Sequence, residues 1–267
     1  MHQDEINAAV VGGHHLVSDG SLPIALPDPK LSLSQDEEWC MVRLDDDWRK
    51  IRFHDYSDIY EIEGLYEKLF RDVLGCRSPE MIAGLLEKQA DRSGTPFDSL
   101  RILVLGAGNG MVGEALANAG ARKIVGVDIL EAAKDAVARD RPGMYYKYHV
   151  ADMTELAPEL KTELKASRFN CLTCVAALGF GDIPVAVFVE AYNLIEAEGL
   201  IAFNIKEEFL NPGSGSDFSD LVGAMIDRGD MVVEAKARYV HRNSTRGLPL
   251  HYVAFVGRKR RDLVDPS

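Results

Sequence analysis

Three glycines at alternate positions form the clearest chemical signal in the sequence. Gly106, Gly108 and Gly110 directly follow the apolar segment 100–105 and directly precede the helix-like segment 111–119. Glycine lets the backbone turn sharply and lets a ligand approach without a Cβ atom in the way. The first turn of the following helix presents free N–H donors and the positive end of the helix dipole. The loop therefore predicts a binding site for an anionic or polar group.

A carboxylate follows 22 residues after the first of these glycines. Asp128 comes directly after the apolar segment 123–127, and a carboxylate in this position can accept two hydrogen bonds from a ribose diol. Together with the glycine loop, it indicates a cofactor that contains a nucleoside. A structural alternative stays open, in which the glycines serve tight packing and Asp128 caps a helix.

The glycine spacing by itself leaves two cofactor classes open. The dinucleotide pattern G-x-G-x-x-G fails from Gly106, because Met111 stands where glycine or alanine is needed, but it matches from Gly108 through Gly113. An NAD(P)-dependent oxidoreductase of Rossmann type is therefore one reading. The sequence contains no Tyr-x-x-x-Lys pair to serve as the proton donor of a short-chain dehydrogenase.

Strands that alternate with helices must position these residues. Apolar strands are expected over 100–105, 123–127, 145–150, 169–177 and 200–205, with helices over 111–119, 129–139 and 183–195. Such alternation implies a parallel sheet covered on both faces, which binds ligands at the carboxyl ends of its strands.

The C-terminal stretch breaks the alternation. Segments 231–241 and 250–257 are both strand-like and are joined by a polar turn, so they must pair antiparallel. The predicted fold is α/β: a Rossmann-like seven-stranded sheet, mostly parallel with an antiparallel C-terminal hairpin, with helices on both faces.

Four regions are expected along the chain. Residues 1–37 are rich in glycine, proline and serine and predict a tail or loose N-terminal cover. Residues 38–95 predict a helical N-terminal region that acts as a lid or contacts substrate, because apolar residues recur at helical spacing between about 48 and 90. Residues 96–261 form the cofactor-binding core, and residues 262–267 form a C-terminal tail.

Residues 100–258 resemble a class I S-adenosylmethionine (SAM)-dependent methyltransferase. The resemblance rests on the first motif at 104–110, the second at 125–128 and the third-strand element at 150–152, and it continues through 169–180, 198–200 and 252–257. Residues 111–114 and 179–184 also weakly resemble the Williams–Beuren-region methyltransferase branch. The resemblance implies that SAM is the cofactor and S-adenosylhomocysteine the product.

The resemblance also implies roles for individual residues. The glycine loop would line the methionine portion of SAM, Asp128 would take both ribose hydroxyls, and Asp152 would accept from the adenine amine. The complete implied cofactor site consists of Tyr56, Tyr60, Gly106, Ala107, Gly108, Asn109, Gly110, Asp128, Ile129, Ala151, Asp152, Met153, Val175 and Ala176. One departure is Val104, because many members of the family carry an acid there that receives the ammonium group of the cofactor.

The acceptor side is less defined. Methyl transfer from a sulfonium is a direct displacement, so the protein mainly aligns the reactants and excludes water. The catalytic residue is unknown, with His54, Asp182 and His241 as weak candidates for a base. The residues expected to contact substrate are Ala177, Phe180, Lys206, Glu207 and Phe209.

Composition limits the partners. The chain has 267 residues and a formal net charge of −12, which disfavours a general nucleic-acid binder and favours a small-molecule acceptor. The basic run 258–261 is expected to be a solvated end. No apolar run has the length of a membrane span, so no membrane partner is expected, and an oligomer stays open. A non-catalytic methyltransferase-fold subunit is the remaining alternative.

The four cysteines do not form a disulfide framework in a chain of this length, which also favours a reducing cytoplasm. Cys171 and Cys174 form a C-x-x-C pair inside an expected buried strand, where residues three apart point to opposite faces. Because no second pair completes a zinc site, no metal is expected.

Overall fold

The computed structural model describes residues 15–17, 22–45, 47–211 and 215–264. The chain forms two compact units. The N-terminal unit comprises Met1–Arg77 and Val240–Leu250, and the core unit comprises Ser78–Tyr239 and His251–Ser267. Among the described segments, no helix has both the length and the apolar character needed to cross a membrane.

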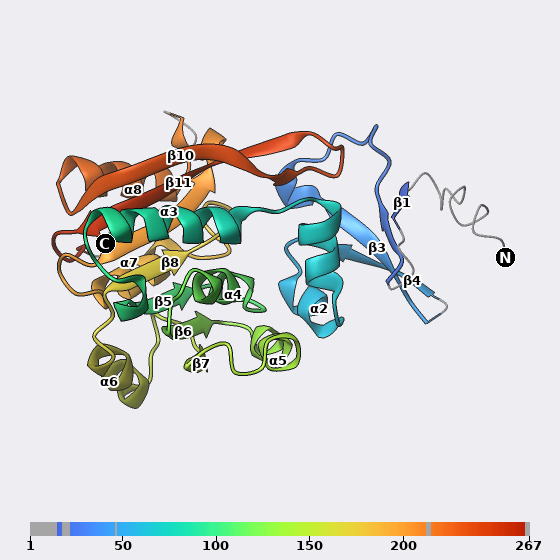
Figure 1. The fold of residues 1–267 in the computed structure, drawn as a ribbon. Helices are drawn as coiled ribbons and strands as arrows, with labels where there is room; N and C mark the ends of the chain where they lie inside the picture. The colour runs from blue at the N-terminus through green and yellow to red at the C-terminus, as the bar shows by residue number, and fades with distance from the viewer. Residues whose placement is uncertain (1–14, 18–21, 46, 212–214, 265–267) are drawn as a thin grey trace. The chain divides into compact units, whose positions relative to one another are not determined.

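The core unit contains a seven-stranded sheet in the order β10-β11-β9-β8-β5-β6-β7 (Figure 1). Its parallel strands are β5 (Arg101–Leu105), β6 (Lys123–Asp128), β7 (Lys147–Val150), β8 (Cys171–Cys174) and β9 (Leu200–Lys206). The C-terminal hairpin consists of β10 (Met231–Asn243) and β11 (Pro249–Lys259), and β11 pairs antiparallel with β9. The predicted fold class is confirmed.

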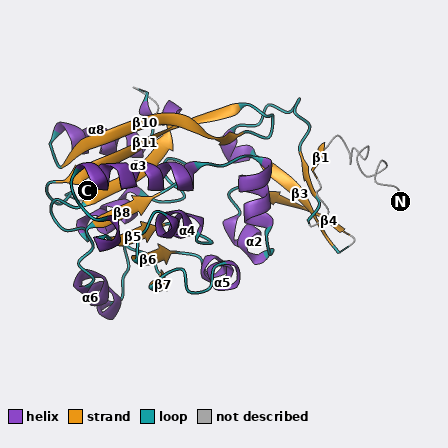
Figure 2. Ribbon diagram, viewed as in Figure 1, coloured by secondary structure: helices purple, strands orange, loops and turns teal. Residues whose placement is uncertain are grey.

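Helices cover both faces of this sheet, as Figure 2 shows by colour. On one face, α3 (Ser78–Arg92), α4 (Met111–Asn118) and α5 (Glu131–Asp140) bury residues in one apolar cluster. On the other face, α6 (Pro158–Ala166), α7 (Val185–Asn193) and α8 (Asp217–Asp227) contribute to a second cluster. The apolar strands lie between two cores, as a parallel sheet requires.

The order of the strands indicates where a ligand site is expected in this sheet. The chain runs from β5 outward to β6 and β7, and then returns to β8 on the opposite side of β5. Ligands of open parallel sheets bind beside the carboxyl ends of the strands, where the order reverses in this way. The glycine loop directly follows β5 and therefore lies at the reversal.

The N-terminal unit contains an antiparallel sheet of its own. Its strands are β1 (His15–Val17), β2 (Ile24–Leu26), β3 (Trp39–Leu44) and β4 (Asp47–Arg52), in that order. Helix α2 (Tyr56–Glu61) and the π-helix Glu67–Val73 follow, and together with the strands they bury an apolar cluster that includes Ile24, Val42 and Leu69.

The N-terminal unit differs from the helical region that the sequence predicted. Residues 39–44 and 47–52 are strands, and the helices begin only at Tyr56. Residues 24–26, expected in a tail or loose cover, form a buried strand that pairs with β3. Most apolar residues with helical spacing in this region lie after Tyr56. The sequence pattern therefore predicts helices and does not reveal the short hairpin at 39–52. The prediction of a tail or loose cover also includes residues 1–14 and 18–21, which lie outside the described residues.

Within this unit, a buried ion pair joins the end of β10 to Glu38, the residue directly before β3. Arg242 Nη2 lies 2.7 Å from Glu38 Oε2, and the two side chains are only 3% and 1% exposed. The second oxygen of Glu38 accepts from the amide of Thr245 at 2.5 Å. The guanidinium also lies over the rings of Phe53 and Phe70, at 5.6 and 5.9 Å from their centroids. Both charges are thus partnered where water is excluded.

Candidate functional site

The glycine loop has the backbone conformation that its residue types allow. The φ angles of Gly106, Gly108 and Gly110 are +66°, +53° and +91°, in the left-handed region that disfavours residues with a Cβ atom. The loop leads directly into α4, which begins at Met111. The predicted succession of strand, turn and helix is therefore present at the carboxyl end of β5.

The side chain of Asp128 holds this loop. Its Oδ2 atom accepts a hydrogen bond from the amide of Gly108 at 2.8 Å, and its Oδ1 atom accepts from the amide of Leu130 at 3.0 Å. Burial raises the pKa of this carboxyl, while the backbone donors oppose that shift. The amide of Ile129 also donates to this carboxylate. Its two oxygens have four lone pairs in all, so acceptor capacity remains for a ribose hydroxyl. The carboxylate thus fits the implied ligand.

Two tyrosines that the sequence interpretation did not identify support the loop from behind. Tyr148 donates its hydroxyl to the carbonyl of Gly108 at 2.9 Å, and its ring packs edge-on against Tyr145 at 5.3 Å between centroids. A Cβ atom at Gly113 would lie 2.8 Å from the hydroxyl of Tyr145. Gly113, which completed the dinucleotide pattern, is therefore required here for packing. The available signal was the cluster of tyrosines at 145, 146 and 148, directly before and within β7.

The expected adenine side lies at the ends of β6 and β7. Ile129 directly follows Asp128 and is 63% exposed. The amide of Ala151 donates to the carbonyl of Asp128 at 2.9 Å, which keeps the two strand ends together. Met153 is buried beside them. A flat apolar group over Ile129 would cover its exposed surface.

Asp152 is the acid expected opposite the adenine amine. Its Oδ1 atom accepts from the amide of Thr154 at 2.8 Å and from the hydroxyl of Thr154 at 2.6 Å. These hydrogen bonds lower the pKa of the Asp152 carboxyl. The carboxylate is therefore ionised and fixed at the rim of the site, where it can act as an acceptor.

The chain after β8 turns back over the glycine loop. Ala176 has a φ angle of +57°, and its amide donates to Oδ1 of Asn204 at 2.6 Å. A Cβ atom built on Gly106 would lie 3.5 Å from the Cβ of Ala177 and 3.0 Å from Cδ1 of Ile183. The structure thus brings the predicted residue Ala177 to the first glycine of the loop.

Three of the expected substrate residues lie together, at the end of β9 and in the segments that follow β8 and β9. The rings of Phe180 and Phe209 pack edge-on at 4.9 Å between centroids, and Lys206 Nζ lies 5.7 Å from each ring. Lys206 also pairs with Glu208 at 2.8 Å. Glu207 differs, because it pairs with Arg238 of β10 at 2.6 Å. Asp182 is exposed in the loop between β8 and α7.

The remaining candidates belong to the N-terminal unit. Tyr56 and Tyr60 lie on or at the start of α2 with their rings stacked at 6.1 Å, and His54 contacts the ring of Tyr56 at 5.8 Å. Tyr60 is buried, and its ring also packs against Tyr66. Closure of a tyrosine over the cofactor stays a prediction.

His241 is enclosed in the N-terminal unit. Its Nδ1 atom lies 3.8 Å from Sγ of Cys76. Burial, followed by the nearby charge of Arg242, holds the pKa of His241 well below its ordinary value. A buried neutral imidazole of this kind favours a packing role over a role as a base for methyl transfer.

The cysteine pair lies in the sheet. Cys171 and Cys174 are fully buried free thiols on β8, and burial raises the pKa of both. This environment favours the structural reading, because a reactive thiol needs a lowered pKa and access. Among the described residues, no group of three histidine, cysteine or acidic side chains is arranged to hold a metal ion.

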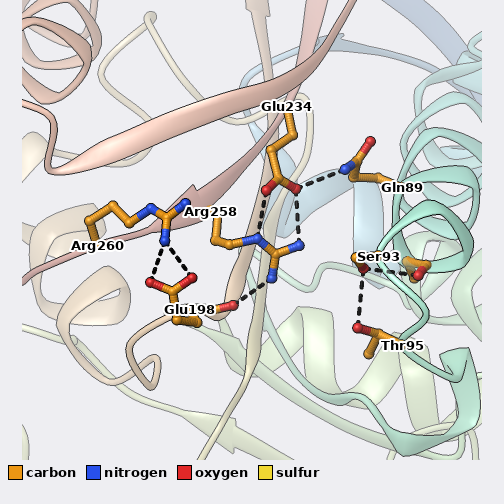
Figure 3. A network of polar contacts seen from close by, with 8 residues as sticks. Gln89, Ser93, Thr95, Glu198, Glu234, Arg258 and Arg260 are labelled. Carbon is orange, nitrogen blue, oxygen red and sulfur yellow. Dashed lines mark hydrogen bonds and ion pairs between the residues drawn. The ribbon is translucent and has the colours of Figure 1, made fainter.

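The basic run at the end of β11 is engaged within the molecule. Arg258 pairs with Glu234 at 2.6 Å, and Arg260 pairs with Glu198, as Figure 3 shows. Lys259 is buried and donates to the carbonyl of Tyr192 at 3.0 Å. Arg261 pairs with Asp230 at 2.7 Å. The expectation of a solvated end is therefore wrong for Arg258 and Lys259, because neighbouring acids and helix carbonyls neutralise them.

Part of the chain is similar to known proteins. Residues 103–203 match the model of the family described as a methyltransferase domain. No curated protein sequence is significantly similar to the chain.

Two solved structures share the fold. A proposed RNA methyltransferase from Pyrococcus horikoshii is 15% identical, with a TM-score of 0.50 over 70% of this chain and 88% of that chain. An S-adenosylmethionine-dependent methyltransferase from Clostridium acetobutylicum is 10% identical, with a TM-score of 0.50 over 74% of this chain and 97% of that chain. At these identities, the similarity concerns the fold.

Proposed function

We propose that the chain is a class I SAM-dependent methyltransferase that transfers a methyl group from SAM to a small-molecule acceptor. The match of residues 103–203 to the model of a methyltransferase domain supports this proposal. The observation that carries the proposal is the bond between the carboxylate of Asp128 and the amide of Gly108. One side chain thereby joins the loop expected at the methionine end of the cofactor to the strand end expected at its ribose.

The described residues fit SAM. Asp128 retains acceptor capacity toward a ribose hydroxyl, and Ile129 offers an exposed apolar surface to the adenine. Asp152 is held ionised at the rim, where it would accept from the adenine amine. When bound, SAM supplies an activated methyl group on a positively charged sulfur.

Alignment and exclusion of water are the main tasks of the protein in such a displacement. The turn at 175–177 packs over Gly106 and would border the reacting groups. No described side chain of the core site is placed as an unmistakable base, and a base is needed only when the acceptor is protonated at the working pH.

Charge distribution supports a small acceptor over a nucleic acid. The formal net charge is −12, and nucleic-acid binding rests on basic side chains that are available to phosphates. The basic run at the end of β11 is occupied by internal carboxylates and carbonyls. We also propose that the protein works in a reducing cytoplasm, because its four cysteines are free thiols.

The cluster of Phe180, Lys206 and Phe209 suggests which small acceptors to test first. Two aromatic rings can contact a flat acceptor, and an ammonium group can pair with an anion on it. The partner of Lys206, Glu208, is largely exposed, so an acceptor carboxylate could replace it. Small aromatic acids are therefore the first acceptor class to offer.

Transfer of a labelled methyl group tests the proposal. The protein is incubated with methyl-labelled SAM and, in separate reactions, with a panel of small aromatic acids, bulk RNA and an unfractionated protein extract. Label is expected in the organic-acid fraction. Label recovered only in RNA or protein would overturn the small-molecule assignment while retaining methyl transfer.

A thermal-shift comparison tests the cofactor class. A ligand that binds only the native state raises the melting temperature. S-adenosylhomocysteine is expected to raise it, and NADH is not. Stabilisation by NADH alone would contradict the proposed function.

A further inference from the structure

Three buried polar side chains meet inside the core unit. The side-chain amide of Asn204 on β9 donates from Nδ2 to Oγ of Ser78 at 3.0 Å and to the hydroxyl of Tyr239 at 2.6 Å. The two hydroxyls lie 2.6 Å apart. Ser78 and Asn204 have no exposed surface, and Tyr239 is 8% exposed. Buried polar groups are costly unless they are hydrogen-bonded, so such a network needs a reason to be present.

The network ends on the backbone of the turn after β8. The last paired residues of β8 and β9 are Cys174 and Phe203. Beyond them, the amide of Ala176 donates to Oδ1 of Asn204 at 2.6 Å instead of to a backbone carbonyl. The Asn204 side chain therefore takes over from the sheet ladder at the point where the chain leaves it.

The backbone of this turn is unfavourable without support. Ala176 has a φ angle of +57°, a left-handed conformation that residues with a Cβ atom adopt at a cost. Such a conformation persists where surrounding contacts determine it, and it is concentrated at functional sites. The hydrogen bond from Ala176 to Asn204 is such a contact.

The left-handed turn directs the chain over the glycine loop. Ala177 follows it at once, and its Cβ lies 3.5 Å from the Cβ position of Gly106. Loss of the left-handed conformation would move this residue away from the loop. Ser78 and Tyr239 are also the two ends of the longer core-unit segment, so the network joins both ends to the turn.

We propose that Asn204, oriented by Ser78 and Tyr239, is a positioning residue that holds the turn at 175–177 against the glycine loop and thereby sets cofactor affinity. The inference rests on the proposed function, because it takes this turn as a wall of the SAM site. Asn204 acts through the backbone of Ala176 and does not itself touch the cofactor.

Two substitutions at Asn204 separate positioning from packing. Asn204→Leu keeps the approximate volume but removes the acceptor for Ala176. Asn204→Asp keeps that acceptor, and the hydroxyls of Ser78 and Tyr239 can donate to the carboxylate. We expect the dissociation constant for S-adenosylhomocysteine, measured by calorimetry on folded protein, to rise at least tenfold in Asn204→Leu. In Asn204→Asp it is expected to stay within threefold of wild type.

Thr173→Val is the matched control in the same strand. Thr173 is fully buried on β8, and among the described residues its hydroxyl has no hydrogen-bond partner. The valine variant is expected to bind as wild type does. If Asn204→Leu does not fold, Tyr239→Phe tests the proposal in its place, because it removes one hydroxyl from the network. Its dissociation constant is expected to rise about threefold, and an unchanged value overturns the proposal.

The outcomes distinguish this inference from the proposed function. If wild type itself does not bind S-adenosylhomocysteine, the proposed function fails. If wild type binds and folded Asn204→Leu binds equally well with a lowered melting temperature, the network only stabilises the fold and the inference is overturned. Equal weakening in Asn204→Leu and Asn204→Asp also overturns it, because the retained acceptor then has no effect.

Discussion

Asp128 serves the fold and the candidate site with the same carboxylate. Its oxygens accept from the amides of Gly108, Ile129 and Leu130, and they retain acceptor capacity for a ligand hydroxyl. The sequence predicted Asp128 and the loop because both depend on local spacing along a strand–turn–helix unit. It did not predict Tyr148, which reaches Gly108 from another strand. Contacts of that kind depend on which strands become neighbours.

Gly106→Ala tests the loop at single-residue resolution. The φ angle of +66° disfavours alanine, and its Cβ would lie 3.0 Å from the flexible end of Ile183. We expect a loss of about 1 kcal/mol in unfolding free energy, measured by urea denaturation. We also expect weaker binding of S-adenosylhomocysteine, measured by calorimetry.

Gly143→Ala is the control for this substitution. Gly143 has a similar φ angle of +76°, but a Cβ there meets nothing within 4 Å. It should lose similar stability and keep its affinity. Equal affinity losses in both variants would show that the effect comes from general destabilisation and not from the loop.

His241 predicts a pH dependence of stability. Burial lowers its pKa in the folded state below the ordinary value of 6.5. The unfolded state therefore binds the proton more tightly, and the contribution of this residue to stability is present above pH 6.5 and is lost as the pH falls below it. The limiting slope is about 1.4 kcal/mol per pH unit.

His241→Asn should flatten the loss of stability between pH 6.5 and 5. Both tryptophans, Trp39 and Trp48, belong to the N-terminal unit, so their fluorescence reports on the unit that contains His241. Identical pH profiles for wild type and variant would contradict a lowered pKa.

At the scale of elements, the sequence predicted best those strands that are buried on both faces of the sheet. Strands β5, β6 and β9 are continuous apolar runs between two cores and were predicted closely. Strand β8 is shorter than expected, because the chain turns at Ala176 although its residues remain apolar. Helices α6 and α8 were not predicted, although Pro158 at the start of α6 and the N-cap residue Ser216 of α8 mark them.

The buried pair between Glu38 and Arg242 fixes the hairpin tip to the residue directly before β3 within the N-terminal unit, and its contribution to stability can be tested. Removing one partner leaves an uncompensated buried charge, which typically costs about 3–5 kcal/mol. Glu38→Gln is therefore expected to lower the urea midpoint of tryptophan fluorescence strongly.

The exposed pair between Arg49 and Asp58, at 2.7 Å, provides the control. Because surface pairs contribute only about 0–1 kcal/mol, Asp58→Asn should shift the same midpoint little. A small shift in both variants would show that the buried pair does not hold the hairpin tip.

At the scale of the whole molecule, the chain builds two units with separate cores. Segment 240–250 belongs to the N-terminal unit although it follows most of the core unit in sequence. Sequence spacing reports neighbours within one element, so it did not indicate that this hairpin tip pairs with Glu38. The same limit applies to the basic run at 258–261, whose acidic partners come from distant segments.

Binding of S-adenosylhomocysteine to wild type and Asp128→Ala, measured by titration calorimetry, tests the central claim most directly. Wild type is expected to bind one molecule per chain. The variant is expected to bind more weakly by about 1–3 kcal/mol, because a charge-assisted contact is lost, while its circular dichroism spectrum shows that it remains folded. The absence of any binding heat with wild type, or equal affinity in the two proteins, would contradict the account.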